Sequence, residues 1–140
     1  MRMLHLARLI RLTVLLVAFG VPAAMADDAQ SVHEVITKQL EAFKQDNGTE
    51  AYSYAAPVIQ QIFPTQDAFM QMVRQGYPQV YRPRSYVFTV MEALDDDYAQ
   101  TVVITDETGK IWNARYSVQR QPDGSWKISG CQILKDFTTS

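Results

Sequence analysis

Residues 110–120 read KIWNARYSVQR, and this stretch decides the fold class. Every second residue in it is apolar or aromatic, namely Trp112, Ala114, Tyr116 and Val118. The residues between them are polar. A period of two residues is typical of a β-strand with one buried face. The sequence therefore predicts a strand from about Lys110 to Arg120, with Trp112 and Tyr116 turned toward the core.

Three further stretches share this period, at about Ser85 to Leu94, Tyr98 to Thr105 and Ser125 to Leu134. Turn sequences separate the four stretches, namely Asp95-Asp96-Asp97, Thr108-Gly109 and Pro122-Asp123-Gly124. Gly130 predicts a bulge or bend in the last strand. Four consecutive strands joined by tight turns predict an antiparallel meander.

The residues before the strands follow a helical period. Ser31 and Glu34 form a capping-box sequence, which predicts the start of a helix. Apolar residues at helical spacing follow on one face: Val32, Val35, Ile36, Leu40 and Phe43. We expect a shorter helix that Thr49 caps, another from Gln66, and an extended connector between Pro78 and Pro83. The sequence therefore predicts an α+β domain in which N-terminal helices pack on a curved four-stranded antiparallel meander.

The N-terminus has the three parts of a secretory signal peptide. A basic start at Arg2, Arg8 and Arg11 precedes an apolar run over 12–21 and the small-residue site Ala24-Met25-Ala26. This run is about half the roughly 20 apolar residues of a membrane span. We expect cleavage between Ala26 and Asp27, which divides the chain into a leader (1–26) and a single domain (27–140). The protein is then periplasmic or secreted in a bacterium, with no stable membrane anchor.

Charge and cysteine content exclude several classes of protein. The full chain has a formal net charge of −2, and residues 1–26 hold three arginines and no acids, so residues 27–140 carry about −5. An acidic domain does not suit a nucleic-acid partner or an anionic membrane surface. Cys131 is the only cysteine, so an internal disulfide is excluded, and we expect a small core residue there.

The sequence contains no recognisable catalytic or metal-binding constellation. His33 is the only histidine after the predicted leader, and we expect a surface or capping role for it. The acids at 95–97 are consecutive at a hairpin tip, whereas a calcium loop needs acids at alternate positions. The triplet therefore predicts a solvated turn. We expect no metal and no cofactor.

Large aromatic side chains are abundant for so small a domain, and such rings can line a pocket for an apolar ligand that their hydroxyls orient. Glu92 is the one acid near a strand rather than at a turn. The candidate pocket-lining residues are Tyr52, Tyr54, Tyr86, Glu92, Trp112 and Tyr116.

Four stretches resemble a known family: AYSYAAPVI (51–59), FMQMVRQGY (69–77), WNARY (112–116) and DGSWKISGC (123–131). The chain resembles an uncharacterised family of bacterial exported proteins that carry a domain of unknown function, from about Val32 to Leu134. The layout also resembles the cystatin-like, nuclear-transport-factor-like (SnoaL-like) cone. That resemblance implies a curved sheet wrapped on a long helix, often with a pocket. Its members include ketosteroid isomerases, dehydratases and domains without activity.

Three functions follow from these features. The first is an exported binding or accessory module whose pocket takes a small apolar or amphipathic ligand, or a segment of a partner. The second is a cofactor-independent lyase or isomerase of the ketosteroid-isomerase type that uses Glu92 with Tyr52 or Tyr116. The third is a structural homodimer joined through the outer face of the sheet. We expect binding rather than catalysis, and a pocket lined only by apolar and aromatic groups would favour binding.

The leader gives the first testable prediction. When the full chain is expressed in a bacterium, protein recovered from the periplasm should begin at Asp27, because Ala24 and Ala26 are the small residues that signal peptidase reads. N-terminal sequencing checks this. A cytoplasmic protein that retains Met1 would contradict it.

Overall fold

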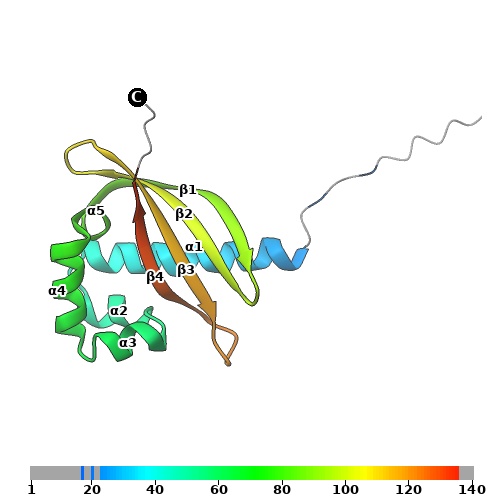
Figure 1. Ribbon diagram of the computed structural model, residues 1–140, viewed down its shortest axis with the longest axis horizontal. Coiled ribbons are helices and arrows are strands. Elements are labelled where there is room, and N and C mark those ends of the chain that lie inside the picture. The colour runs from blue at the N-terminus through cyan, green and yellow to red at the C-terminus, as the bar shows by residue number, and fades with distance from the viewer. Residues whose placement is uncertain (1–16, 18–19, 21–22, 136–140) are drawn as a thin grey trace, which may run out of the picture.

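The computed structural model describes residues 17, 20 and 23–135, so most of the predicted leader lies outside the described residues. Helices at the N-terminus pack on one antiparallel sheet, as Figure 1 shows. The helices are α1 (Ala23–Lys44), α2 (Gly48–Ser53), α3 (Pro57–Ile62), α4 (Gln66–Gly76) and α5 (Pro78–Tyr81). The strands are β1 (Pro83–Leu94), β2 (Asp97–Asp106), β3 (Ile111–Arg120) and β4 (Trp126–Leu134). The predicted α+β architecture is confirmed.

The sheet is the predicted meander, with its strands in the order β1-β2-β3-β4. β4 contains the predicted bulge beside Gly130: Ser117 pairs with Gly130, but Val118 pairs with Ile128, so Ser129 is an extra residue. One extra residue reverses the alternation of side chains. Ile128 and Cys131 consequently turn to the same face, toward the helices.

The core lies between this face of the sheet and α1, which runs across it (Figure 1). The predicted apolar face of α1 is buried, from Val32 to Phe43. On the sheet, Ala114, Tyr116 and Val118 are buried as the alternation predicts, and Trp112 is half-buried on the same side.

The expected start of the first helix at Ser31 is wrong, because α1 begins at Ala23. Alanine and methionine over 23–26 favour the helix, so it extends upstream of the capping-box sequence. Within the helix the Ser31 hydroxyl donates a hydrogen bond to the Asp27 carbonyl oxygen (3.1 Å), and Glu34 pairs with Lys38 (2.7 Å). The bond between Ala26 and Asp27 thus lies in the first turns of α1.

Two further local predictions are corrected. Asn47, rather than Thr49, caps α2: its side-chain oxygen accepts a hydrogen bond from the Glu50 amide (3.1 Å). The connector after Pro78 is the helical turn α5 instead of an extended segment. Proline suits the first position of a helix, and the Arg82 amide closes this turn by donating to the Pro78 carbonyl (3.0 Å).

No helix in the part of the chain that the structure describes is long and apolar enough to cross a membrane.

Trp126 tests the packing of helices on the sheet. It is 9% exposed, and its ring lies 5.4 Å from that of Tyr98. Trp126→Ala should lower the free energy of unfolding by about 3 kcal/mol, because it leaves a cavity at the end of the core. Val87→Ala, at a site that is 62% exposed, should change it by less than about 0.5 kcal/mol. Urea denaturation measures both; equal effects would contradict the assignment of this face.

Candidate functional site

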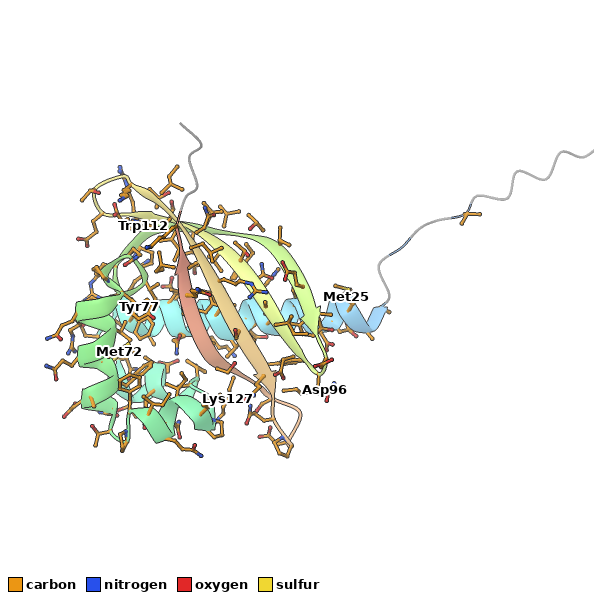
Figure 2. All side chains as sticks on the ribbon, in the orientation of Figure 1. Met25, Met72, Tyr77, Asp96, Trp112 and Lys127 are labelled. Atoms are coloured by element: carbon orange, nitrogen blue, oxygen red, sulfur yellow. The ribbon has the colours of Figure 1, made fainter. Side chains whose placement is uncertain are left out.

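A cavity of about 290 Å³ lies between the sheet and the helices. On the helical side its wall is apolar and aromatic: Phe43, Ile59, Phe63, Phe69, Met72 and Val73. Met72 and Tyr77, which also lines the cavity, lie on the α4 side of the molecule in Figure 2, away from Asp96 in the β1–β2 turn. The side chains that line the cavity are all uncharged in their ordinary states at neutral pH.

Aromatic packing fixes the helical wall. The Phe69 ring of α4 lies 6.1 Å from the Phe43 ring at the end of α1, 5.5 Å from Tyr52 and 6.5 Å from Phe63. The Tyr52 hydroxyl donates a hydrogen bond to the Phe63 carbonyl oxygen (2.5 Å). Aromatic rings from α1, α2, α4 and the residue after α3 therefore pack together around Phe69. This packing fixes the positions of α3 and α4 relative to the sheet.

The sheet supplies the opposite wall, through Tyr116 of β3 and Ile128, Gly130 and Cys131 of β4. The bulge at Ser129 matters here, because Cys131 would otherwise point away from the helices. Tyr116 and Cys131 are directly paired across the two strands. The bulge thus brings a phenol and a thiol together on the cavity wall.

Tyr116 is the unusual residue of this site. It is 1% exposed, and its hydroxyl has no hydrogen-bond partner among the described residues. Burial, followed by the nearby thiol of Cys131, holds the pKa of Tyr116 well above its ordinary value, so the phenol keeps its proton. Gln79 Oε1 is also buried without a partner, but Gln79 does not line the cavity. Buried polar atoms are normally paired, so the Tyr116 hydroxyl, whose oxygen is itself buried, is an exception among the groups of this site.

Two more polar groups lie beside it. Cys131 is half-buried as a residue, and the burial of its thiol raises the pKa to about 12, an effect that the neighbouring Tyr116 hydroxyl partly offsets. The Tyr77 hydroxyl donates its proton to the Cys131 carbonyl oxygen (3.1 Å). Gln39 donates its amide to the Ala51 carbonyl oxygen (3.1 Å). Of the two tyrosine hydroxyls on the cavity wall, that of Tyr116 is the one without a hydrogen bond of ordinary geometry in the described structure, although the Cys131 thiol lies close enough to interact with it.

Of the six candidates from the sequence, the structure places Tyr116 in this cavity and the other five elsewhere. Tyr52 lies behind the wall, against Phe69. Tyr54 lines a separate, more polar groove beside Trp126, and its hydroxyl donates to Glu50 (2.8 Å).

The remaining three candidates lie on β1 and β3. The Tyr86 hydroxyl faces Glu41 of α1 (3.5 Å). Glu92 accepts a hydrogen bond from Arg115 (2.8 Å), with both side chains at the solvent surface opposite the helices. Trp112 donates its indole N–H to Asp106 (2.8 Å) at the end of the sheet.

His33 does not take the surface or capping role that we expected. Its ring stacks on Phe88 at 4.2 Å, and its Nε2 lies 3.0 Å from the side-chain oxygen of buried Gln100. The Gln100 amide donates to the carbonyl oxygens of Val90 (3.3 Å) and Thr101 (2.8 Å). Because both donors of Gln100 are used, its oxygen accepts, and His33 Nε2 carries a proton.

The acidic triplet lies in the β1–β2 turn. Over the described residues, no three His, Cys, Asp or Glu side chains are grouped as a metal ion requires.

The sequence interpretation missed most of the cavity wall, in particular Phe43, Phe63, Met72 and Cys131. Part of the signal was present: Phe69, Met72 and Val73 share one face of α4. Cys131 could be assigned to the cavity side of the sheet only by following the alternation of side chains along β4. That count must allow for the extra residue at the bulge, which Gly130 predicted.

The fold and the cavity define a small α+β domain with a partly open, largely apolar pocket between its helices and its sheet. The chain belongs to the family described as domain of unknown function (DUF4864), whose sequence pattern matches residues 25–139. A comparison with curated proteins gives no match.

One solved structure is similar in fold, a protein from Catenulispora acidiphila determined at 2.5 Å. The two chains share 16% identity at a TM-score of 0.51, over 79% of this chain and 93% of the other. Agreement at so low an identity supports the shared fold alone.

The high pKa of Cys131 predicts an unreactive thiol. The thiolate is the form that reacts, and raising the pKa from 9.0 to about 12 reduces its fraction near pH 8 about a thousandfold. Alkylation by iodoacetamide should be slower than that of a small thiol by at least about tenfold, because the greater nucleophilicity of a high-pKa thiolate offsets part of its scarcity, and the rate should rise with pH up to pH 10. Mass spectrometry follows the reaction, with urea-unfolded protein as the fast control. An ordinary rate in the folded protein would contradict the burial of the thiol.

Proposed function

We propose that the protein is an exported binding module that holds a small apolar molecule in the cavity between α4 and the sheet. The observation that carries the proposal is the buried hydroxyl of Tyr116, which has no hydrogen bond of ordinary geometry and belongs to a residue of a largely apolar wall. Ligand sites combine apolar walls with a few placed polar groups, and this cavity has that composition.

The size of the cavity limits the ligand. A volume of 290 Å³ corresponds to about ten non-hydrogen atoms, at roughly 30 Å³ for each in a liquid. This is the low end of the range for small-molecule sites. A single ring system or a short chain fits within this volume, and a larger molecule would project from the open side of the cavity.

The cover of the cavity is the short helix α3. Ile59 of α3 and Phe63 just after it line the cavity, yet none of the side chains of α3 itself is fully buried. Backbone contacts tie it down at one end, where the Ala56 amide donates to the Ile128 carbonyl oxygen (2.8 Å). A segment with little buried surface opens at low cost. We therefore assign α3 as the entry point for the ligand.

The position of Glu92 supports binding over the alternative of a lyase or isomerase. That reaction needs an acid beside a tyrosine hydroxyl inside the pocket. Glu92 instead pairs with Arg115 at the solvent surface, and the groups that line the cavity with Tyr116 are apolar, aromatic, a thiol and the Gln39 amide, with no carboxylate among them.

Export and fold kinship belong to the same proposal. The leader over 1–26 supports export to the periplasm or beyond, and the family match begins at residue 25, beside the expected cleavage bond. The long helix packed on an antiparallel sheet supports kinship with the cystatin-like, nuclear-transport-factor-like cone. Fold kinship does not assign the ligand.

Filling the cavity tests the proposal. Naphthalene has about the right size, so it should bind the folded protein and raise its melting temperature with concentration. Met72→Trp places a larger side chain in the wall and should weaken naphthalene binding at least about tenfold. Isothermal calorimetry and thermal melts measure these effects.

The matched control is Val87→Trp, which adds a similar ring at a site that is 62% exposed on β1, away from the cavity and its cover. It should bind naphthalene like the parent protein. Absence of binding to the parent, or equal losses in both variants, would overturn the proposed site.

A further inference from the structure

We propose that the cavity selects neutral molecules that carry one hydrogen-bond acceptor, such as a carbonyl oxygen, and holds that oxygen on the Tyr116 hydroxyl. This inference rests on the proposed function and specifies the ligand class of the same site. It follows from three properties of the wall: a Tyr116 proton whose nearest possible partner is a thiol, the weakness of that thiol as an acceptor, and the absence of charged side chains.

The free donor is the first property. A phenol that keeps its proton has one hydrogen to donate, and no described residue accepts it with good geometry. Tyr77 also lines the cavity, but its proton is already given to the Cys131 carbonyl oxygen. A ligand oxygen near Tyr116 therefore gains a hydrogen bond and displaces at most the weak contact with the Cys131 thiol, and it satisfies a buried polar group.

The thiol is the second property. Cys131 is the polar side chain next to Tyr116, and sulfur is a weak acceptor compared with a carbonyl oxygen. The thiol stays protonated because burial raises its pKa. A carbonyl oxygen is therefore the better partner for the Tyr116 proton, and the thiol does not supply a competing negative charge.

The absence of charge in the wall is the third property. A carboxylate brought into this cavity would lose its hydration and meet no cationic side chain among the residues that line it. The same burial already keeps both Tyr116 and Cys131 in their neutral forms. The site consequently favours ketones, aldehydes, esters or amides over anions of the same shape.

Three molecules of nearly identical shape separate these possibilities: acetophenone, α-methylstyrene and benzoate. Acetophenone presents a carbonyl oxygen, α-methylstyrene replaces it by a methylene group, and benzoate is charged near pH 7.5. The parent protein should bind acetophenone about tenfold more tightly than α-methylstyrene, the size of one net hydrogen bond. Benzoate should bind at least about a hundredfold more weakly than acetophenone. Ligand-observed NMR titrations give the three constants.

Tyr116→Phe should remove the preference for acetophenone and leave α-methylstyrene binding unchanged or tighter. Because the hydroxyl has no partner, this variant should melt at or above the temperature of the parent. Tyr86→Phe removes a hydroxyl outside the cavity and should keep the preference.

The outcomes distinguish the two proposals. If neither acetophenone nor α-methylstyrene binds the parent protein, the proposed site itself is wrong. If both bind equally, or if benzoate binds best, the cavity exists but the assignment of Tyr116 as its polar anchor is overturned. The comparison within the parent protein decides the question even if a variant is unstable.

Discussion

The structure depends on one constraint: a four-stranded antiparallel sheet must bury one face, and a single helix is too narrow to cover it. A helix is about 10 Å wide with its side chains, whereas four strands spaced about 4.8 Å apart span roughly 14 Å between their outer backbones. Ile36, Leu40 and Phe43 of α1 join Val102 and Val118 of the sheet in one core cluster. The rest of that face is left to the shorter helices, and the cavity lies there.

Two fully buried polar side chains of this core differ in how completely their hydrogen bonds are satisfied. Gln100 is 0% exposed, yet its amide donates twice to backbone carbonyls and its oxygen accepts from His33. That network is satisfied and joins α1 to the middle of β1. Tyr116 is buried to the same degree without a protein partner. Burying an unpaired hydroxyl normally lowers the stability of the folded protein. The presence of Tyr116 on a cavity wall therefore favours a role in binding.

The sequence was sufficient for the sheet and for the inner face of α1, because both depend on periodicity. Each strand was predicted within a few residues of its bounds, and the apolar positions from Val32 to Phe43 are buried. Local signals were weaker at helix ends: the Ser31 sequence did not start α1, and Pro78 began a helical turn.

The candidate site was harder to predict, because a cavity is a gap left by elements that meet from distant parts of the chain. Tyr116 was identified from its strand. Met72 and Phe43 line the same cavity as Tyr116 only because α4 packs against α1. No sequence pattern within one segment predicts that contact.

The central claim is that the space beside Tyr116 is an apolar site that admits small molecules. A crystal structure of the parent protein under xenon pressure tests this directly, because xenon enters dry apolar cavities and avoids hydrated ones. We expect xenon density between Met72 and Tyr116. A chain of ordered waters there, bonded to the Tyr116 hydroxyl and excluding xenon, would contradict the claim.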